Sequence, residues 1–127
     1  MSRIKHIVFV SRSRLAHNLL GLFTQTSPKQ IQCTCFVDFS SLAESNISHT
    51  VHLMIVDHAV FLEGKTEHEI SQILQGRFFK QAKKILLHGR HDQFDETHLR
   101  ENGFCHFLAK PFLPEEMIGL IQRCLKG

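Results

Sequence analysis

Short apolar runs alternate with helix-patterned segments along this whole chain, and this alternation constrains the fold more than any other feature. Runs rich in Val, Ile and Phe predict buried strands, and apolar residues at helical spacing predict amphipathic helices. We expect strands at 4–10, 31–37, 51–56, 84–87 and 104–108, and helices at 14–23, 42–46, 66–79, 93–101 and 114–125. Strict alternation predicts an α/β fold: a doubly wound, five-stranded parallel sheet with helices on both faces, a three-layer sandwich.

The bulk composition fits one domain covering residues 1–127. Hydrophobic residues make up 43% of the chain and charged residues 21%, which is typical of a folded globular domain. No apolar stretch approaches the roughly 20 residues of a membrane-spanning helix. The N-terminus lacks the long apolar segment of a secretory signal, so we expect a cytoplasmic protein without membrane contact.

The charge pattern argues against nucleic-acid binding by this domain. The formal net charge is +3, and the densest basic group is Lys80, Lys83 and Lys84, with Arg77 nearby. A nucleic-acid interface would more often show a basic stripe with aromatic partners, or a known reading motif.

The four cysteines do not follow the spacing of a metal motif. Cys33 and Cys35 are spaced C-x-C in a predicted strand, while Cys105 and Cys124 lie far apart in the sequence. Because there is no C-x-x-C pair and no second cluster at zinc-finger spacing, we expect reduced, partly buried thiols and no metal ligands.

Polar residues follow the predicted strands at the points where the strands end. Ser11 and Arg12 follow the first strand, Asp57 the third, His88 the fourth and Lys110 the fifth. The carboxyl ends of parallel strands carry the functional site in doubly wound sheets, so these side chains are expected to meet. The first strand-to-helix turn has no glycine-rich phosphate cradle, which argues against a nucleotide or flavin binder.

The chain resembles the receiver domain of bacterial two-component response regulators, the CheY-like family. Three features carry the resemblance: Asp57 after the third strand, a polar residue after the fourth, and the run Lys110-Pro111-Phe112 after the fifth. The resemblance covers essentially the whole chain and implies a flavodoxin-like fold. It implies that Asp57 would accept a phosphoryl group from a kinase's histidine and that Lys110 would contact the phosphoryl oxygens. It also implies a switch aromatic at Phe107, and Pro111 becomes a candidate for a cis peptide bond.

The chain departs from this family at the positions that bind magnesium. Receivers have two acids after the first strand, where this chain has Ser11 and Arg12. A hydroxyl and a guanidinium cannot supply two anionic oxygens, so Mg²⁺ binding would be weak and we expect no cofactor. We expect Arg12 to replace the metal in a cluster with Asp57 and Lys110. His88 replaces a Ser or Thr, and would either hydrogen-bond Asp57 or block inward movement of a phosphate.

Simpler interpretations of the same residues stay open at this point. Asp57 could be a loop or capping acid, Lys110 could serve only in an ion pair, and Phe107 could simply pack in the core. Asp57, His58 and His88 could instead bind zinc, although separate loop histidines are more often surface residues.

The favoured function is a degenerate receiver, or pseudo-receiver, that is not an enzyme and acts as a protein-interaction module. Its partner would be a histidine kinase or a downstream signalling protein, and a homodimer is a further option. The alternative is a working receiver phosphorylated at Asp57. A flavodoxin-like flavin or nucleotide binder is the third hypothesis.

Overall fold

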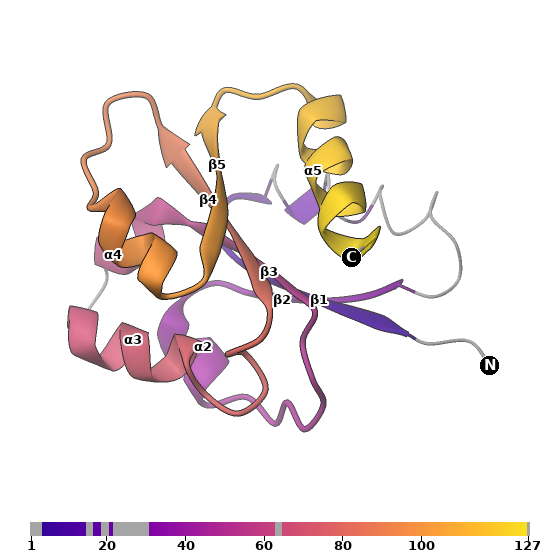
Figure 1. Cartoon of the computed structure of the whole chain (residues 1–127), viewed down its shortest axis with the longest axis vertical. Coiled ribbons are helices and arrows are strands. Elements are labelled where there is room, and N and C mark those ends of the chain that lie inside the picture. The colour runs from indigo at the N-terminus through magenta and orange to yellow at the C-terminus, as the bar shows by residue number, and fades with distance from the viewer. Residues whose placement is uncertain (1–3, 15–16, 19–20, 22–30, 63–64, 127) are drawn as a thin grey trace.

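A five-stranded, all-parallel sheet forms the centre of the computed structural model, which describes residues 4–14, 17–18, 21, 31–62 and 65–126 (Figure 1). The strand order is β2-β1-β3-β4-β5, the flavodoxin-like order, so the predicted doubly wound α/β fold is confirmed. The strands are β1 (Lys5–Val10), β2 (Ile31–Phe36), β3 (Leu53–Asp57), β4 (Lys83–Gly89) and β5 (Phe104–Lys110).

Helices cover both faces of this sheet and make three layers. Helix α5 lies on one face, and α2, α3 and α4 lie on the other (Figure 1). The helices are α2 (Phe39–Ala43), α3 (Glu67–Leu74), α4 (Glu96–Glu101) and α5 (Pro114–Lys126), with a 3-10 helix η1 (His58–Leu62) after β3. The helix predicted at 14–23 lies mostly outside the described residues. No helix in the described part of the chain is long and apolar enough to cross a bilayer.

The central strand β3 supplies both hydrophobic cores because its side chains alternate between the two faces. Leu53 and Ile55 pack into the core under α5, whereas Met54 and Val56 pack into the core under the other helices. All four side chains are fully buried, which explains why this strand is an unbroken apolar run.

Several element boundaries differ from the predicted ones. Strand β3 starts two residues later than expected and includes Asp57, and β4 extends to Gly89, so His88 lies inside the strand. The segment directly after β3, which is outside the predicted helices, forms η1, and α3 ends at Leu74 instead of near residue 79. A capping box starts α3, since the Thr66 hydroxyl accepts from the backbone N–H of Glu69 and the Glu69 carboxylate accepts from the backbone N–H of Thr66.

Candidate functional site

The carboxylate of Asp57 at the end of β3 is the centre of the candidate site. Its side chain is only 7% exposed. The ammonium of Lys110, at the end of β5, donates to both carboxylate oxygens, at 2.9 Å to Oδ1 and 2.8 Å to Oδ2. The backbone N–H of Ala59 donates to Oδ1 at 3.2 Å, and the Ser11 hydroxyl donates to Oδ2 at 3.1 Å. The sheet therefore brings Ser11, Asp57 and Lys110 together as the sequence predicts.

Ser11 is fixed by hydrogen bonds at the end of β1 and is fully buried. Its backbone N–H donates to the carbonyl of Phe36 at 2.9 Å, which ties it to the end of β2. Its hydroxyl oxygen accepts from the backbone N–H of Ser13 at 3.0 Å while the hydroxyl donates to Asp57. A neutral hydroxyl that already takes part in two hydrogen bonds thus lies where the receiver resemblance predicts the first acid.

The predicted Arg12–Asp57 contact is wrong. The Arg12 guanidinium donates instead to Asp38 Oδ2 at 3.1 Å, in an exposed ion pair beside β2. Asp38 also caps α2, because its Oδ1 accepts from the backbone N–H of Ser41 at 2.8 Å. This backbone hydrogen bond, helped by the Arg12 charge, lowers the pKa of Asp38 and keeps it ionised beside the arginine.

His88 does not bond the site carboxylate, since its Nδ1 donates to the carbonyl of Gly89 at 2.9 Å. Its ring meets the edge of Phe94 with 5.0 Å between centroids, and Phe94 stacks on Phe107 at 5.7 Å with 6° between the planes. The guanidinium carbon of Arg100 lies 5.0 Å from the centroid of Phe107. Phe107 is thus half-buried between an aromatic ring and a cation, a more specific setting than plain core packing.

The zinc hypothesis for Asp57, His58 and His88 is also wrong. His58 Nδ1 lies 3.3 Å from an oxygen of Asp92, in a contact at the surface. Within the described ranges, the one group of three or more suitable side chains close enough for a metal is elsewhere: Cys105, His106 and Cys124. Sequence spacing gave no sign of that group. The peptide bond before Pro111 is cis, as predicted.

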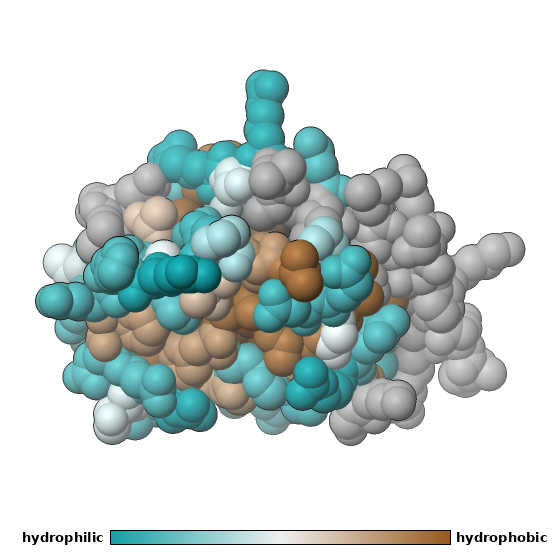
Figure 2. Space-filling model, turned by 90° about the horizontal axis from the view of Figure 1, so that it is seen from above, coloured by the Kyte–Doolittle hydropathy of each residue, from teal (hydrophilic) through white to brown (hydrophobic). Residues whose placement is uncertain are grey.

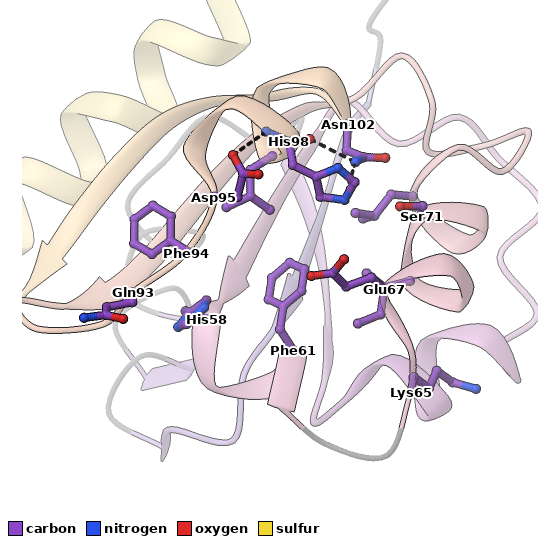
Figure 3. Close-up of a pocket in the computed structure, with 13 residues that line it drawn as sticks. His58, Phe61, Lys65, Glu67, Ser71, Gln93, Phe94, Asp95, His98 and Asn102 are labelled. Atoms are coloured by element: carbon purple, nitrogen blue, oxygen red, sulfur yellow. Dashed lines mark hydrogen bonds between the residues drawn. The ribbon is translucent and has the colours of Figure 1, made fainter.

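A separate pocket of about 210 Å³ lies between η1, α3 and α4 (Figure 3). Its walls combine apolar rings with polar groups: Phe61, Phe94, Glu67, His98 and Asn102. Pockets for small-molecule ligands usually measure about 300 to 1,000 Å³, and Asp57 does not line this one. The pocket therefore gives little support to the flavin or nucleotide hypothesis.

The basic group seen in the sequence is divided by the fold. Lys84 is fully buried, and its ammonium donates to the carbonyls of Phe79 and Ala82 at 3.0 and 3.1 Å. Burial lowers the pKa of Lys84 to about 8. This lysine cannot contact a phosphate backbone, so the surface is less basic here than the sequence suggests.

No protein-family model and no curated protein matches the sequence. Solved structures do match its fold. Chemotaxis response regulator CheY4 of Vibrio cholerae superposes with a TM-score of 0.73 at 17% identity, over 95% of this chain and 98% of that one. The BeF3-activated receiver domain of DrrB, a Thermotoga maritima protein, gives 0.70 at 21% identity, over 98% and 99%. Another Thermotoga maritima response regulator gives 0.65 at 14% identity, over 98% and 99%. The chain therefore has the fold of response-regulator receiver domains.

Proposed function

We propose that this chain is a receiver-like signalling domain of a bacterial two-component system that binds a protein partner without phosphorylation of Asp57. The observation that supports this proposal most strongly is the burial and bonding of the Asp57 carboxylate. It is buried, paired with Lys110 at 2.8 and 2.9 Å, and bonded by the hydroxyl of Ser11. The other acid position holds Arg12, which is paired with Asp38.

Phosphoryl transfer to Asp57 would add negative charge to a site that lacks a place for a divalent cation. Magnesium takes oxygen ligands in a near-octahedral arrangement and usually needs one or two carboxylates. In the described part of the chain, Asp57 is the one carboxylate that Ser11 and Lys110 bond, and the Ser11 hydroxyl is already used in bonds to Asp57 and Ser13. Without the metal, Lys110 alone would offset the charge that develops in the transition state, so we expect transfer to be slow or absent.

The face of α4, β5 and α5 is the proposed surface for the partner. Strand β5 is an edge strand, and Phe107 on it is half-buried under Arg100. Leu113, just before α5, is 63% exposed. Seen from above, the molecule shows apolar areas bordered by hydrophilic side chains (Figure 2). On the proposed face, exposed Leu113 and the Arg100 cation over Phe107 combine apolar and charged groups, which suits a protein partner, either a histidine kinase or a downstream signalling protein.

A working receiver is the second candidate function, because the Asp57–Lys110 pair keeps the geometry that the acceptor and its lysine would need. Intact-mass spectrometry after incubation with acetyl phosphate and Mg²⁺ distinguishes the working receiver from the pseudo-receiver. We expect the wild-type protein to show no gain of about 80 Da, the mass of one phosphoryl group. A gain that disappears in Asp57→Asn would overturn the pseudo-receiver and establish the working receiver.

The double variant Ser11→Asp/Arg12→Asp is the matched gain-of-function test. It supplies the two missing carboxylates, so we expect measurable Mg²⁺ binding by calorimetry and the mass gain that the wild type lacks. Circular dichroism spectra of both proteins check that they are folded. A folded double variant that does not bind Mg²⁺ would show that Ser11 and Arg12 do not occupy the metal-binding positions.

A further inference from the structure

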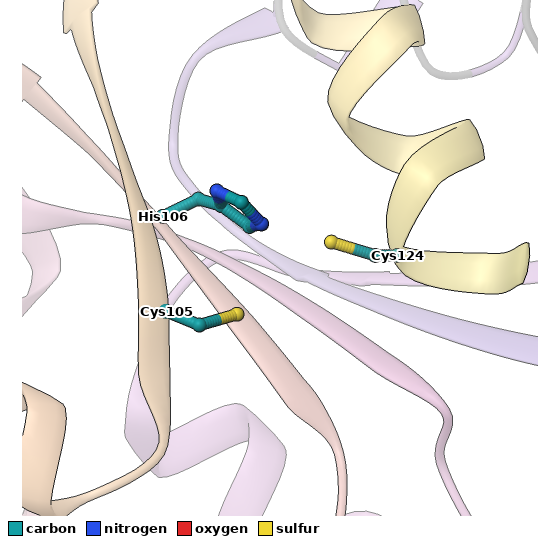
Figure 4. Close-up of side chains that lie close together, drawn as sticks. All are labelled: Cys105, His106 and Cys124. Atoms are coloured by element: carbon teal, nitrogen blue, oxygen red, sulfur yellow. The ribbon is translucent and has the colours of Figure 1, made fainter. Parts of the chain in front are cut away.

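Two thiols and an imidazole meet at the edge of the sheet, on the opposite side from the pocket of Figure 3. Cys105 and His106 come from β5, and Cys124 comes from α5 (Figure 4). One potential ligand atom from each side chain lies within 4.8 Å of the other two. Both cysteines are free thiols.

A β-bulge explains how two consecutive residues of one strand contribute to the same cluster. Neighbouring side chains on a regular strand point to opposite faces. In the pairing of β4 with β5, Lys84 is opposite Phe104 but Ile85 is opposite His106, so Cys105 is an extra residue in β5. Bulges of this kind re-aim side chains. Here both Cys105 and His106 extend toward Cys124 on the helix (Figure 4).

The surroundings of the cluster keep the Cys124 thiol protonated until a cation binds. Burial, together with the neighbouring thiol of Cys105, raises the pKa of Cys124 to about 11, so without a cation this thiol keeps its proton at neutral pH. Lys83 and Arg123 act in the other direction and lower the pKa of Cys124. A bound divalent cation would displace the thiol protons, and two thiolates would neutralise its charge.

We propose that Cys105, His106 and Cys124 form a zinc(II) site, with a water molecule at the fourth position. Two thiolates and one imidazole are ligands that zinc prefers, at about 2.3 Å for sulfur and 2.0–2.1 Å for nitrogen in tetrahedral geometry. That geometry places two sulfurs about 3.7 Å apart, so the ligand atoms, already within 4.8 Å of one another, need only a small approach. Cys105 is exposed, which leaves the fourth position open to solvent. The metal would tie α5 to the edge strand β5.

Cobalt(II) titration of the reduced, metal-free chain without a histidine tag tests this proposal. We expect one equivalent of Co²⁺ to produce thiolate-to-cobalt charge-transfer absorption and intense visible bands of tetrahedral coordination, and Zn²⁺ to abolish both by displacement. Zn²⁺ should also raise the Tm of the wild-type protein. Binding should weaken as the pH falls, because protons compete for the thiolates.

Variants locate the site. Cys33→Ser/Cys35→Ser is the matched control, since it removes the other two thiols, and it should keep the cobalt spectrum. Cys124→Ser and Cys105→Ser should each lose it, and His106→Gln should weaken cobalt binding by at least about tenfold. Cys124 is buried, so loss of the spectrum in Cys124→Ser could result from unfolding. Cys105 is exposed, so Cys105→Ser should stay folded and its spectrum decides the test. Absence of the thiolate absorption in the wild type, or its loss only in the Cys33→Ser/Cys35→Ser control, would overturn the proposal. None of these results depends on Asp57, so the experiments can refute the zinc site without refuting the proposed function, and the reverse.

Discussion

Removing the charge of Lys110 should lower the stability of the protein much more than removing the charge of Asp57, its partner in the ion pair. Lys110→Met keeps most of the side-chain stem but removes the ammonium that bonds both carboxylate oxygens. The Asp57 side chain, 7% exposed, would then be a buried charge held only by the donors of Ser11 and Ala59. Breaking a fully buried pair in this way costs about 3–5 kcal/mol. Since the Lys110 side chain is 39% exposed and two donors remain, we expect the free energy of unfolding to fall by about 2–3 kcal/mol.

Asp57→Asn removes the buried charge instead and leaves the ammonium, which water can reach. We expect this variant to lose only about 0–1 kcal/mol. The double variant Lys110→Met/Asp57→Asn no longer buries an unpaired charge. It should therefore be more stable than Lys110→Met alone by about 1–2 kcal/mol, a strongly non-additive result.

Urea unfolding at neutral pH, followed by circular dichroism, measures all four proteins of this cycle. The comparison is valid where the dependence of the unfolding free energy on urea stays the same among them. Equal losses in the two single variants, or a double variant whose loss equals the sum of the single losses, would refute the argument that the carboxylate depends on the ammonium.

Two further predictions concern titratable groups away from this site. A hydrogen bond from Cys33 lowers the pKa of Cys35 to about 7, so the rate at which iodoacetamide modifies Cys35 should rise with a pH midpoint of about 7. The variant Cys33→Ser should shift that midpoint. An unchanged midpoint would contradict the interaction between the two thiols. Burial lowers the pKa of His6 and His52, whose rings lie 6.1 Å apart, below the usual 6.5. The unfolded chain therefore binds more protons as the pH falls through about 6.5, and the free energy of unfolding should decrease from about pH 7.5 to 5.5. A pH dependence that is no smaller in His52→Gln, measured by urea unfolding, would show that this pair does not contribute.

The sequence predicts those features of the site that depend on the backbone of the sheet. Asp57 and Lys110 follow apolar runs that could only be buried strands, and parallel strands bring their carboxyl ends to one edge. Their pairing follows from that topology because a carboxylate buried at this edge needs a cation, and the lysine is within reach. Ser11 meets Asp57 for the same reason, since β1 and β3 are neighbours.

The sequence does not predict contacts that depend on a choice among side-chain partners or on an irregularity in the sheet. Arg12 is long and exposed, and two aspartates lie near it: Asp57 is the last residue of β3 and Asp38 follows β2, the two strands next to β1. It pairs with Asp38, where the guanidinium stays in water, because moving it against buried Asp57 would cost desolvation. The cluster with Cys105 depends on one extra residue in β5, which places Phe104 and Phe107 against the same core although they are three positions apart. The sequence does not reveal this shift, because the run 104–109 is almost continuously apolar.

If Ser11 and Arg12 lie at the two acid positions, as we propose, their identity should affect stability as well as chemistry. Three carboxylates at one strand edge repel one another unless a divalent cation lies between them. With Ser11 donating to Asp57, the site is neutral and fully hydrogen-bonded without metal. The variant Ser11→Asp/Arg12→Asp should therefore have a lower Tm than the wild type in the presence of a chelator, and Mg²⁺ should raise its Tm while leaving that of the wild type unchanged. Equal responses of the two proteins to Mg²⁺ would mean that the neutral site does not stabilise the fold in this way.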